Sequence, residues 1–243
     1  MRVNFKSPIL PAGVILAAVS FTAAAHLTSP ADSIAIPTDV SGVVTLEALE
    51  YVASEQPADW AAVADVVVVA KATHEKAHAP AQSETTVDSN LIGRTVTVEP
   101  TETIWRAAES KRELPKSIDL TASGWVTNDG ETSEVNLGYG SRVEVGHTYV
   151  LALVWAEEIC GEDPQPAEWA IIGSEGALPI DDGVVGKGEI GAAVKASVDV
   201  STTTPGSVLA LAAGKSSAAV GAALDSVEDE VKRVPFRATN SNC

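Results

Sequence analysis

Two short apolar runs constrain the fold of this chain most strongly. The first, Ala64–Ala72 (ADVVVVAKA), holds four consecutive valines, and the second, Thr148–Trp155 (TYVLALVW), is also strongly apolar. β-Branched residues favour strands, and an unbroken apolar run of this length is typical of a strand that is buried on both faces. The two runs therefore predict two buried strands of a β fold.

Weaker strand signals lie between and after these runs. Gly93–Pro100 (GRTVTVEP) alternates valine with threonine and can extend to Trp105, and Ile118–Ala122 alternates again. The segments Trp169–Gly173 and Ala177–Ile180 are expected to form a hairpin. Five or six strands separated by long loops predict a mainly β fold, which is either a small OB-like barrel or a β-sandwich.

Two segments have a helical pattern of apolar residues. Thr45–Ala53 is predicted as a short N-terminal helix that Pro57 ends, and Ser217–Val234 as a C-terminal helix that Pro235 ends. The predicted organisation is a signal peptide over 1–25, a disordered lead over 26–42, a β-rich domain over 43–190, a linker over 191–206 and a helical C-terminal extension over 207–243.

The first 25 residues predict export. Arg2 and Lys6 form a basic start, Ile9–Ala25 carries no charge, and this run ends in three alanines, which is the pattern that signal peptidase cleaves. Cleavage would leave a secreted or cell-envelope-associated domain that begins near His26, with no stable insertion in the membrane. Retention of the segment as an anchor is the alternative, but its 17 uncharged residues are short for a membrane span.

The net charge of −17 limits the expected partners. An acidic surface repels nucleic acid and anionic lipid head groups, so no nucleic-acid partner is expected. We expect an unidentified envelope or extracellular protein, or a small ligand, bound by the loops Thr73–Asn90 and Thr127–Gly140. No cofactor is expected. The tryptophans could form a ligand-stacking surface, but Trp155 and Trp169 flank strands, which favours a place in the core.

The two cysteines, Cys160 and Cys243, both follow the predicted signal peptide. In an oxidising compartment they are expected to form one intramolecular disulfide bond. By chain-entropy reasoning, closing the loop between Cys160 and Cys243 would contribute about 4 kcal/mol to the free energy of unfolding. A dimer that is linked through Cys243 and a pair of free thiols are the alternatives.

One segment matches a catalytic motif. His74–His78 (HEKAH) has the pattern H-E-x-x-H, in which two imidazoles one helical turn apart bind zinc and the glutamate activates a water. Here the motif follows a strand directly, and Pro80 limits any helix to about two turns. The sequence therefore favours an exposed loop and a domain without catalytic residues. A zinc-dependent hydrolase that uses His74, Glu75 and His78 is the alternative function, and weak adventitious metal binding by the two histidines is a third interpretation.

A family resemblance covers roughly Leu46–Gly188. The order of an acidic exported lead, a short helix, the strands ADVVVV and GHTYVLAL and the segment IIGSEGALPIDDG resembles uncharacterised secreted proteins of high-GC actinobacteria with an OB-like barrel. The strands are also similar to those of the netrin and metalloproteinase-inhibitor barrel. That family depends on an N-terminal cysteine and several disulfides, which this chain lacks, so its inhibitory activity is not transferred. The resemblance implies a secreted binding domain and no particular ligand.

Overall fold

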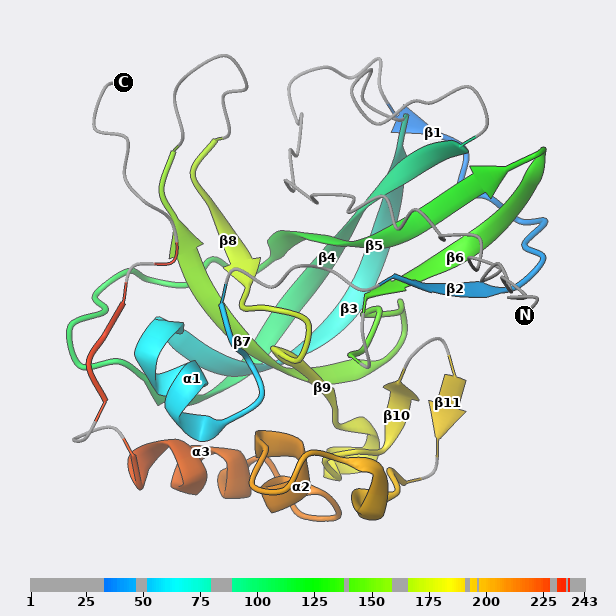
Figure 1. Cartoon of the computed structure of the whole chain (residues 1–243). Coiled ribbons are helices and arrows are strands. Elements are labelled where there is room, and N and C mark those ends of the chain that lie inside the picture. The colour runs from blue at the N-terminus through cyan, green and yellow to red at the C-terminus, as the bar shows by residue number, and fades with distance from the viewer. Residues whose placement is uncertain are drawn as a thin grey trace, which may run out of the picture.

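The computed structural model describes residues 33–46, 52–79, 89–137, 140–158, 166–190, 193–195, 197–227, 231–234 and 236. One sheet dominates this part of the chain and the helices are short (Figure 1), so the prediction of a mainly β fold with small helices is confirmed. The predicted signal peptide over 1–25 lies outside the described residues, and so do Cys160 and Cys243. The expected export and disulfide bond therefore stay predictions.

The main sheet is mixed. Its strands are β1 (Ser33–Ile34), β2 (Val43–Leu46), β3 (Val66–His78), β4 (Ser89–Arg106), β5 (Ile118–Asn128), β6 (Glu131–Leu137), β7 (Thr148–Ala156), β8 (Glu168–Ile171) and β9 (Ala177–Pro179). They lie in the order β2-β6-β5-β4-β3-β7-β8, with β1 paired to β3 and β9 paired to β7. Only the β2–β6 pairing is parallel.

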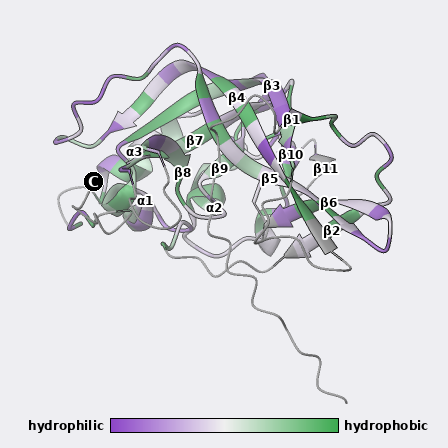
Figure 2. Cartoon of the chain, turned by 90° about the horizontal axis from the view of Figure 1, so that it is seen from above, coloured by the Kyte–Doolittle hydropathy of each residue, from purple (hydrophilic) through white to green (hydrophobic). Residues whose placement is uncertain are grey.

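The two apolar runs are confirmed as strands, and they pair with each other inside this sheet. In the β3–β7 ladder Val66 lies opposite Leu153, and Lys71 lies opposite Thr148. Most side chains of both strands are buried where they pair, as the unbroken apolar runs predict. The predicted extension of the next strand to Trp105 is also confirmed. Hydrophobic and hydrophilic residues alternate as bands along the long strands (Figure 2), because successive side chains point to opposite faces.

The N-terminal segment 33–46 pairs with the sheet, which corrects the predicted disordered lead (26–42) over residues 33–42, while 26–32 lie outside the described residues. Its start, β1, pairs with the end of β3 at His78, and its end, β2, pairs with β6. Between them, the Ser41 amide donates to the Thr132 carbonyl. The segment thus bridges the two outer strands of the β3-β4-β5-β6 run (Figure 1). The predicted helix over Thr45–Ala53 is wrong at its start, which belongs to β2, and residues 47–51 lie outside the description.

The sheet has an apolar core on each of its two faces. One face is covered by α1 (Pro57–Val63), α2 (Val208–Ala212) and α3 (Ala218–Asp225), which lie side by side below the sheet in Figure 1. The second core is enclosed by the sheet itself, because the apolar inner positions of β3, β4, β5 and β7 pack together with residues of β8 and β9. No helix of the described residues is long and apolar enough to span a membrane.

Helix α1 begins at Pro57, the residue that was expected to end a helix. Proline is tolerated at the first helical position, where its missing N–H has no intrahelical partner. The Asp59 carboxylate accepts a hydrogen bond of 2.8 Å from the backbone N–H of Gln56 and so caps the helix. Trp60 is fully buried beneath the sheet. The proline signal was therefore correct as a helix boundary but was assigned to the wrong end.

The C-terminal region packs onto the helical face. The predicted helix over Ser217–Val234 is confirmed only at Ala218–Asp225, where Val220 and Leu224 join the core with residues of α1 and β7. Residues 231–234 are not helical. In this segment, the Arg233 side chain donates hydrogen bonds to the Ala61 and Ala64 carbonyls at the end of α1. The predicted linker over 191–206 contains β11 (Ala193–Lys195), which pairs with β10 (Gly188–Ile190), and a 3-10 turn (Val200–Thr202).

The hairpin that was expected over Trp169–Ile180 is not formed. Its two strands, β8 and β9, both pair with β7, β8 along Leu153–Ala156 and β9 along Tyr149–Leu151. β7 is long enough to pair with both short strands in succession, and the turn between them reaches across to the start of α1. There the Glu175 amide donates to Ser54 Oγ at 3.0 Å. A second 3-10 turn (Asp181–Gly183) follows β9.

Candidate functional site

The HEKAH segment lies on strand β3, so its assignment to an exposed loop is wrong. The β3–β4 register shifts between Ala72 and His74, which marks a β-bulge at this point. Before the bulge the even-numbered residues face the inner core, whereas after it Glu75 and Ala77 do. A bulge of one residue exchanges the two faces of a strand. It therefore keeps both histidines out of the interior and turns the glutamate inward.

The two histidines are not brought together in the way that a zinc site requires. Four residues of extended strand separate positions 74 and 78 by about 13 Å, instead of one helical turn. His78 Nε2 lies 2.8 Å from Thr95 Oγ1, and His74 Nδ1 lies 3.1 Å from Thr73 Oγ1. Within the described residues, no three His, Cys, Asp or Glu side chains are grouped so that they could hold a metal ion.

The two faces of β3 predict opposite effects for neighbouring substitutions. His74→Ala is expected to change the free energy of unfolding by less than about 0.5 kcal/mol, because the side chain is exposed. Glu75→Ala is expected to lower it by about 1–3 kcal/mol, because it removes an ionic partner of a buried arginine. Urea denaturation measures both. A larger loss for His74→Ala, accompanied by release of bound zinc, would contradict this assignment and favour the hydrolase.

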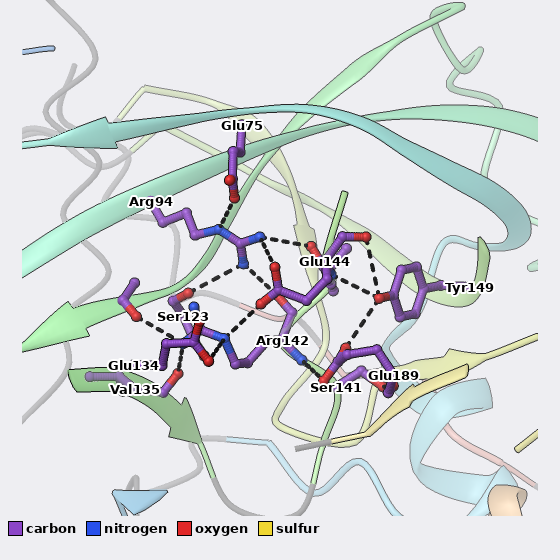
Figure 3. Close-up of polar contacts among 12 residues, drawn as sticks. Glu75, Arg94, Ser123, Glu134, Val135, Ser141, Arg142, Glu144, Tyr149 and Glu189 are labelled. Carbon is purple, nitrogen blue, oxygen red and sulfur yellow. Dashed lines mark hydrogen bonds and ion pairs between the residues drawn. The ribbon is translucent and has the colours of Figure 1, made fainter. Parts of the chain in front are cut away.

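A buried polar cluster fills the interior of the sheet beyond the inner apolar core (Figure 3). We call it the arginine cluster: its members are Glu75, Arg94, Glu134, Arg142, Glu144, Tyr149 and Glu189. Both arginine side chains are fully buried. Arg94 Nε donates to Glu75 at 2.7 Å, and Arg94 Nη2 donates to Glu144 at 2.9 Å. The other oxygen of the Glu144 carboxylate accepts from Arg142 Nε at 2.7 Å, so one carboxylate joins the two guanidinium groups.

Backbone carbonyls and an aromatic ring complete the surroundings of the two arginines. Arg94 Nη1 donates to the Arg142 carbonyl at 2.8 Å, and Arg142 Nη1 donates to the Gly124 carbonyl at the same distance. The Trp125 ring centroid lies 5.7 Å from one guanidinium carbon and 5.8 Å from the other. Arg94 has the same parity on β4 as Val96 and Val98, so the alternation of the strand signalled its burial. Nothing in the local pattern signalled its partners, which come from three other segments: β3, β5 and residues 142–144.

Within the arginine cluster, Tyr149 connects Glu144 to Glu189, which lies on strand β10. Its hydroxyl donates to Glu189 at 3.1 Å and accepts from the Glu144 amide at 2.8 Å. Burial, and then the neighbouring Glu189 carboxylate, raise the pKa of Tyr149 far above its usual value. The phenol therefore stays protonated in the folded protein at every pH at which tyrosine ionises in an unfolded chain.

This raised pKa predicts that the protein is sensitive to alkali. Tyrosine in the unfolded chain loses its proton near pH 10.0, whereas folded Tyr149 retains it. The contribution of this group to the free energy of unfolding is full below pH 10 and falls by about 1.4 kcal/mol for each pH unit above it. Urea denaturation between pH 8 and 11 should show a steeper loss for wild type than for Tyr149→Phe. Parallel curves would contradict the assignment.

A histidine–carboxylate pair lies next to this cluster. His147 Nδ1 lies 2.5 Å from Asp181 Oδ2, and the other carboxylate oxygen accepts from the Thr148 amide at 2.9 Å. Among the described residues, no hydroxyl or thiol hydrogen-bonds the remaining nitrogen of His147. The pair orients the turn before β7.

A cavity of about 480 Å³ opens where the end of β7 meets the C-terminal segment. We call it the Trp155 pocket. Four segments line it: residues 63 and 65 after α1, 110–112 between β4 and β5, 154, 155 and 157 at the end of β7, and 233, 234 and 236. The volume lies within the range of small-molecule sites. The predicted binding loops do not contribute to it, and most of their described residues belong to strands β3 to β6.

The pocket combines an aromatic wall with cationic groups. The Arg112 guanidinium carbon lies 3.9 Å from the ring centroid of Trp155, and Val63 and Val154 also line the pocket. Trp155 also packs edge-to-face on Trp169, with ring centroids 5.6 Å apart. The prediction that these two tryptophans belong to the core is therefore incomplete for Trp155, which contacts the inner core and also lines the pocket.

Arg233 holds the C-terminal segment against the pocket. Its Nη2 donates to Asp65 at 2.8 Å, its Nε lies 2.7 Å from Glu109, and its Nη1 donates to the Ala64 carbonyl. The Val234 amide donates to the Ala62 carbonyl at 2.9 Å. The bonds to Asp65 and to the Ala62 and Ala64 carbonyls join residues about 170 positions apart in the chain, so no local sequence signal could have located this pocket.

Comparison of the chain with protein family models, with curated proteins and with solved structures finds no match. Its function must therefore be inferred from its own residues.

Proposed function

We propose that this chain is an exported, cell-envelope-associated or secreted binding domain without catalytic activity, and that the Trp155 pocket is its ligand site. The observation that carries the proposal is the composition of that pocket. An indole ring, three valines and three cations converge from four segments on one cavity of ligand size. A rigid sheet supports one wall, because Trp155 and Val154 belong to β7.

The distribution of polar groups supports binding over catalysis. In the arginine cluster, the buried Arg94 and Arg142 side chains are paired with the Glu75 and Glu144 carboxylates, and these ion pairs connect strands and loops. The described residues that line the Trp155 pocket include no histidine or cysteine. Ser110 carries the one hydroxyl among these lining residues, and within the described part of the chain no hydrogen bond joins that hydroxyl to a general base. The aromatic ring, the apolar side chains and the cations of this pocket are groups that can recognise a small ligand.

A pocket-filling variant tests the proposal. Ser110→Trp places a bulky ring in the cavity without removing a charge, and Ala222→Trp places the same ring at an exposed position of α3. Each protein is incubated with a small-molecule extract of the parent organism's envelope and examined by native mass spectrometry. We expect wild type and Ala222→Trp to carry an added mass that Ser110→Trp lacks. Equal retention by all three proteins, or no added mass on wild type, would overturn the assignment of the pocket.

A further inference from the structure

The cations of the Trp155 pocket differ in how strongly they are already paired. Arg233 is committed to Asp65 and Glu109 and to backbone carbonyls. Arg112 lies 3.7 Å from Glu157, but these two side chains are 47% and 57% exposed, and an ion pair in water contributes little. Lys111 is exposed and has no ion-pair partner among the described residues. Arg112 also lies over the Trp155 ring, with its guanidinium carbon 3.9 Å from the ring centroid, and a guanidinium in that position can still donate N–H groups to a carboxylate. Lys111 and Arg112 are therefore two neighbouring cations on the β4–β5 connection that can bind an anion.

The charge balance of the pocket limits the ligand further. Three cations and two carboxylates line it, which leaves one net positive charge in a chain whose overall net charge is −17. The rest of the surface repels anions, so an anion finds local attraction here. Asp65 and Glu157 would repel a second negative charge. A single negative charge is thus the best match.

Apart from Ser110, the remaining lining is apolar. The side chains of Val63, Val154, Val234 and Phe236 accompany the Trp155 ring. Val63 and Val154 are already buried, whereas Val234 is 47% exposed. A ligand body that covers Val234 and Phe236 removes apolar surface from water, whereas a fully hydrophilic anion would leave that surface exposed. Resting on the proposed function, we propose that the Trp155 pocket binds a small amphiphilic monocarboxylate, with its carboxylate on Lys111 and Arg112 and its apolar body against Val234 and Phe236.

The inference is tested with three ten-carbon amphiphiles: decanoate, decanol and decylamine. Isothermal titration calorimetry below their micellar concentrations measures the Kd of each for wild type, for a Lys111→Gln/Arg112→Gln variant and for a Lys71→Gln/Lys195→Gln control. The control removes two exposed cations that lie outside the pocket. All four side chains are exposed, so circular dichroism should show the same fold in each protein.

We expect wild type and the control to bind decanoate at least about tenfold more tightly than decanol, because a charge-assisted hydrogen bond contributes that much. The Lys111→Gln/Arg112→Gln variant should lose this preference and keep its decanol affinity. Equal affinity for decanoate and decanol, tighter binding of decylamine, or no binding of decanoate would each overturn the inference. In those cases the Ser110→Trp comparison still decides whether the pocket binds another ligand, so the two proposals can fail separately.

Discussion

Replacing Arg94 with methionine is expected to lower the free energy of unfolding by about 3–5 kcal/mol. The side chain is fully buried and neutralises Glu75 and Glu144. Removing one partner of a buried ion pair leaves the other charge in a poorly solvated place, which costs more than the pair contributed. The Arg142 and Val143 carbonyls would also lose their donors. Because whole domains are stable by about 5–15 kcal/mol, this loss is a large part of the total stability.

Two comparisons distinguish this effect from a general effect of charge. Lys76→Met removes a cation from the exposed face of β3 and should change stability by less than about 0.5 kcal/mol. The double variant Arg94→Met/Glu75→Gln should lose less than the two single variants added together, because the uncompensated carboxylate has gone. Urea denaturation followed by circular dichroism provides all four values. An Arg94→Met protein as stable as Lys76→Met would refute the structural role of the arginine cluster.

Replacing Trp60 with alanine should cost a similar amount, about 3–5 kcal/mol, for a different reason. The indole is fully buried and its Nε1 donates to the Ser54 carbonyl at 2.6 Å. Truncation creates a cavity between α1, the sheet and α3, and orphans the carbonyl. Since α3 packs on the same core as β7, we expect the helices and the sheet to unfold in one transition.

The control for Trp60→Ala is Leu211→Ala, at a position of α2 that is 43% exposed. It should cost less than about 0.5 kcal/mol. Far-ultraviolet circular dichroism follows the backbone, and near-ultraviolet circular dichroism follows the tryptophans of the sheet. Coincident, equally shifted transitions are expected for Trp60→Ala. If the sheet signal kept its wild-type midpoint, the C-terminal helices would be the independent extension that the sequence pattern suggested.

Strand position and side-chain parity were readable from the sequence. Four valines in succession and the run TYVLALVW located β3 and β7, because two-sided burial demands apolar residues at every position. Threonine–valine alternation located β4 and placed Arg94 on its buried face. These signals are local, since they depend only on the period of two that a strand imposes on its own side chains.

Strand ends and bulges were not readable in this way. The polar letters of HEKAH and of residues 131–137 suggested loops, yet both segments are paired strands, because a neighbour's backbone stabilises a strand whatever its side chains are. One β-bulge near Thr73 then determines which face of β3 each residue of His74–His78 occupies. The hydrophobic pattern likewise predicted a hairpin at Trp169–Ile180, but both of its strands pair with β7 instead of with each other.

The sequence by itself determined that this chain forms a mainly β fold with two central apolar strands and few helices. Only the tertiary structure decided where its chemistry lies. The arginine cluster draws Glu75, Arg94, Arg142 and Glu189 from separate elements, and the Trp155 pocket needs Arg233 to hold the end of the chain beside β7. Periodicity reports the environment of one segment at a time. A site that is built from side chains up to about 170 residues apart has no period, and only packing brings its members together.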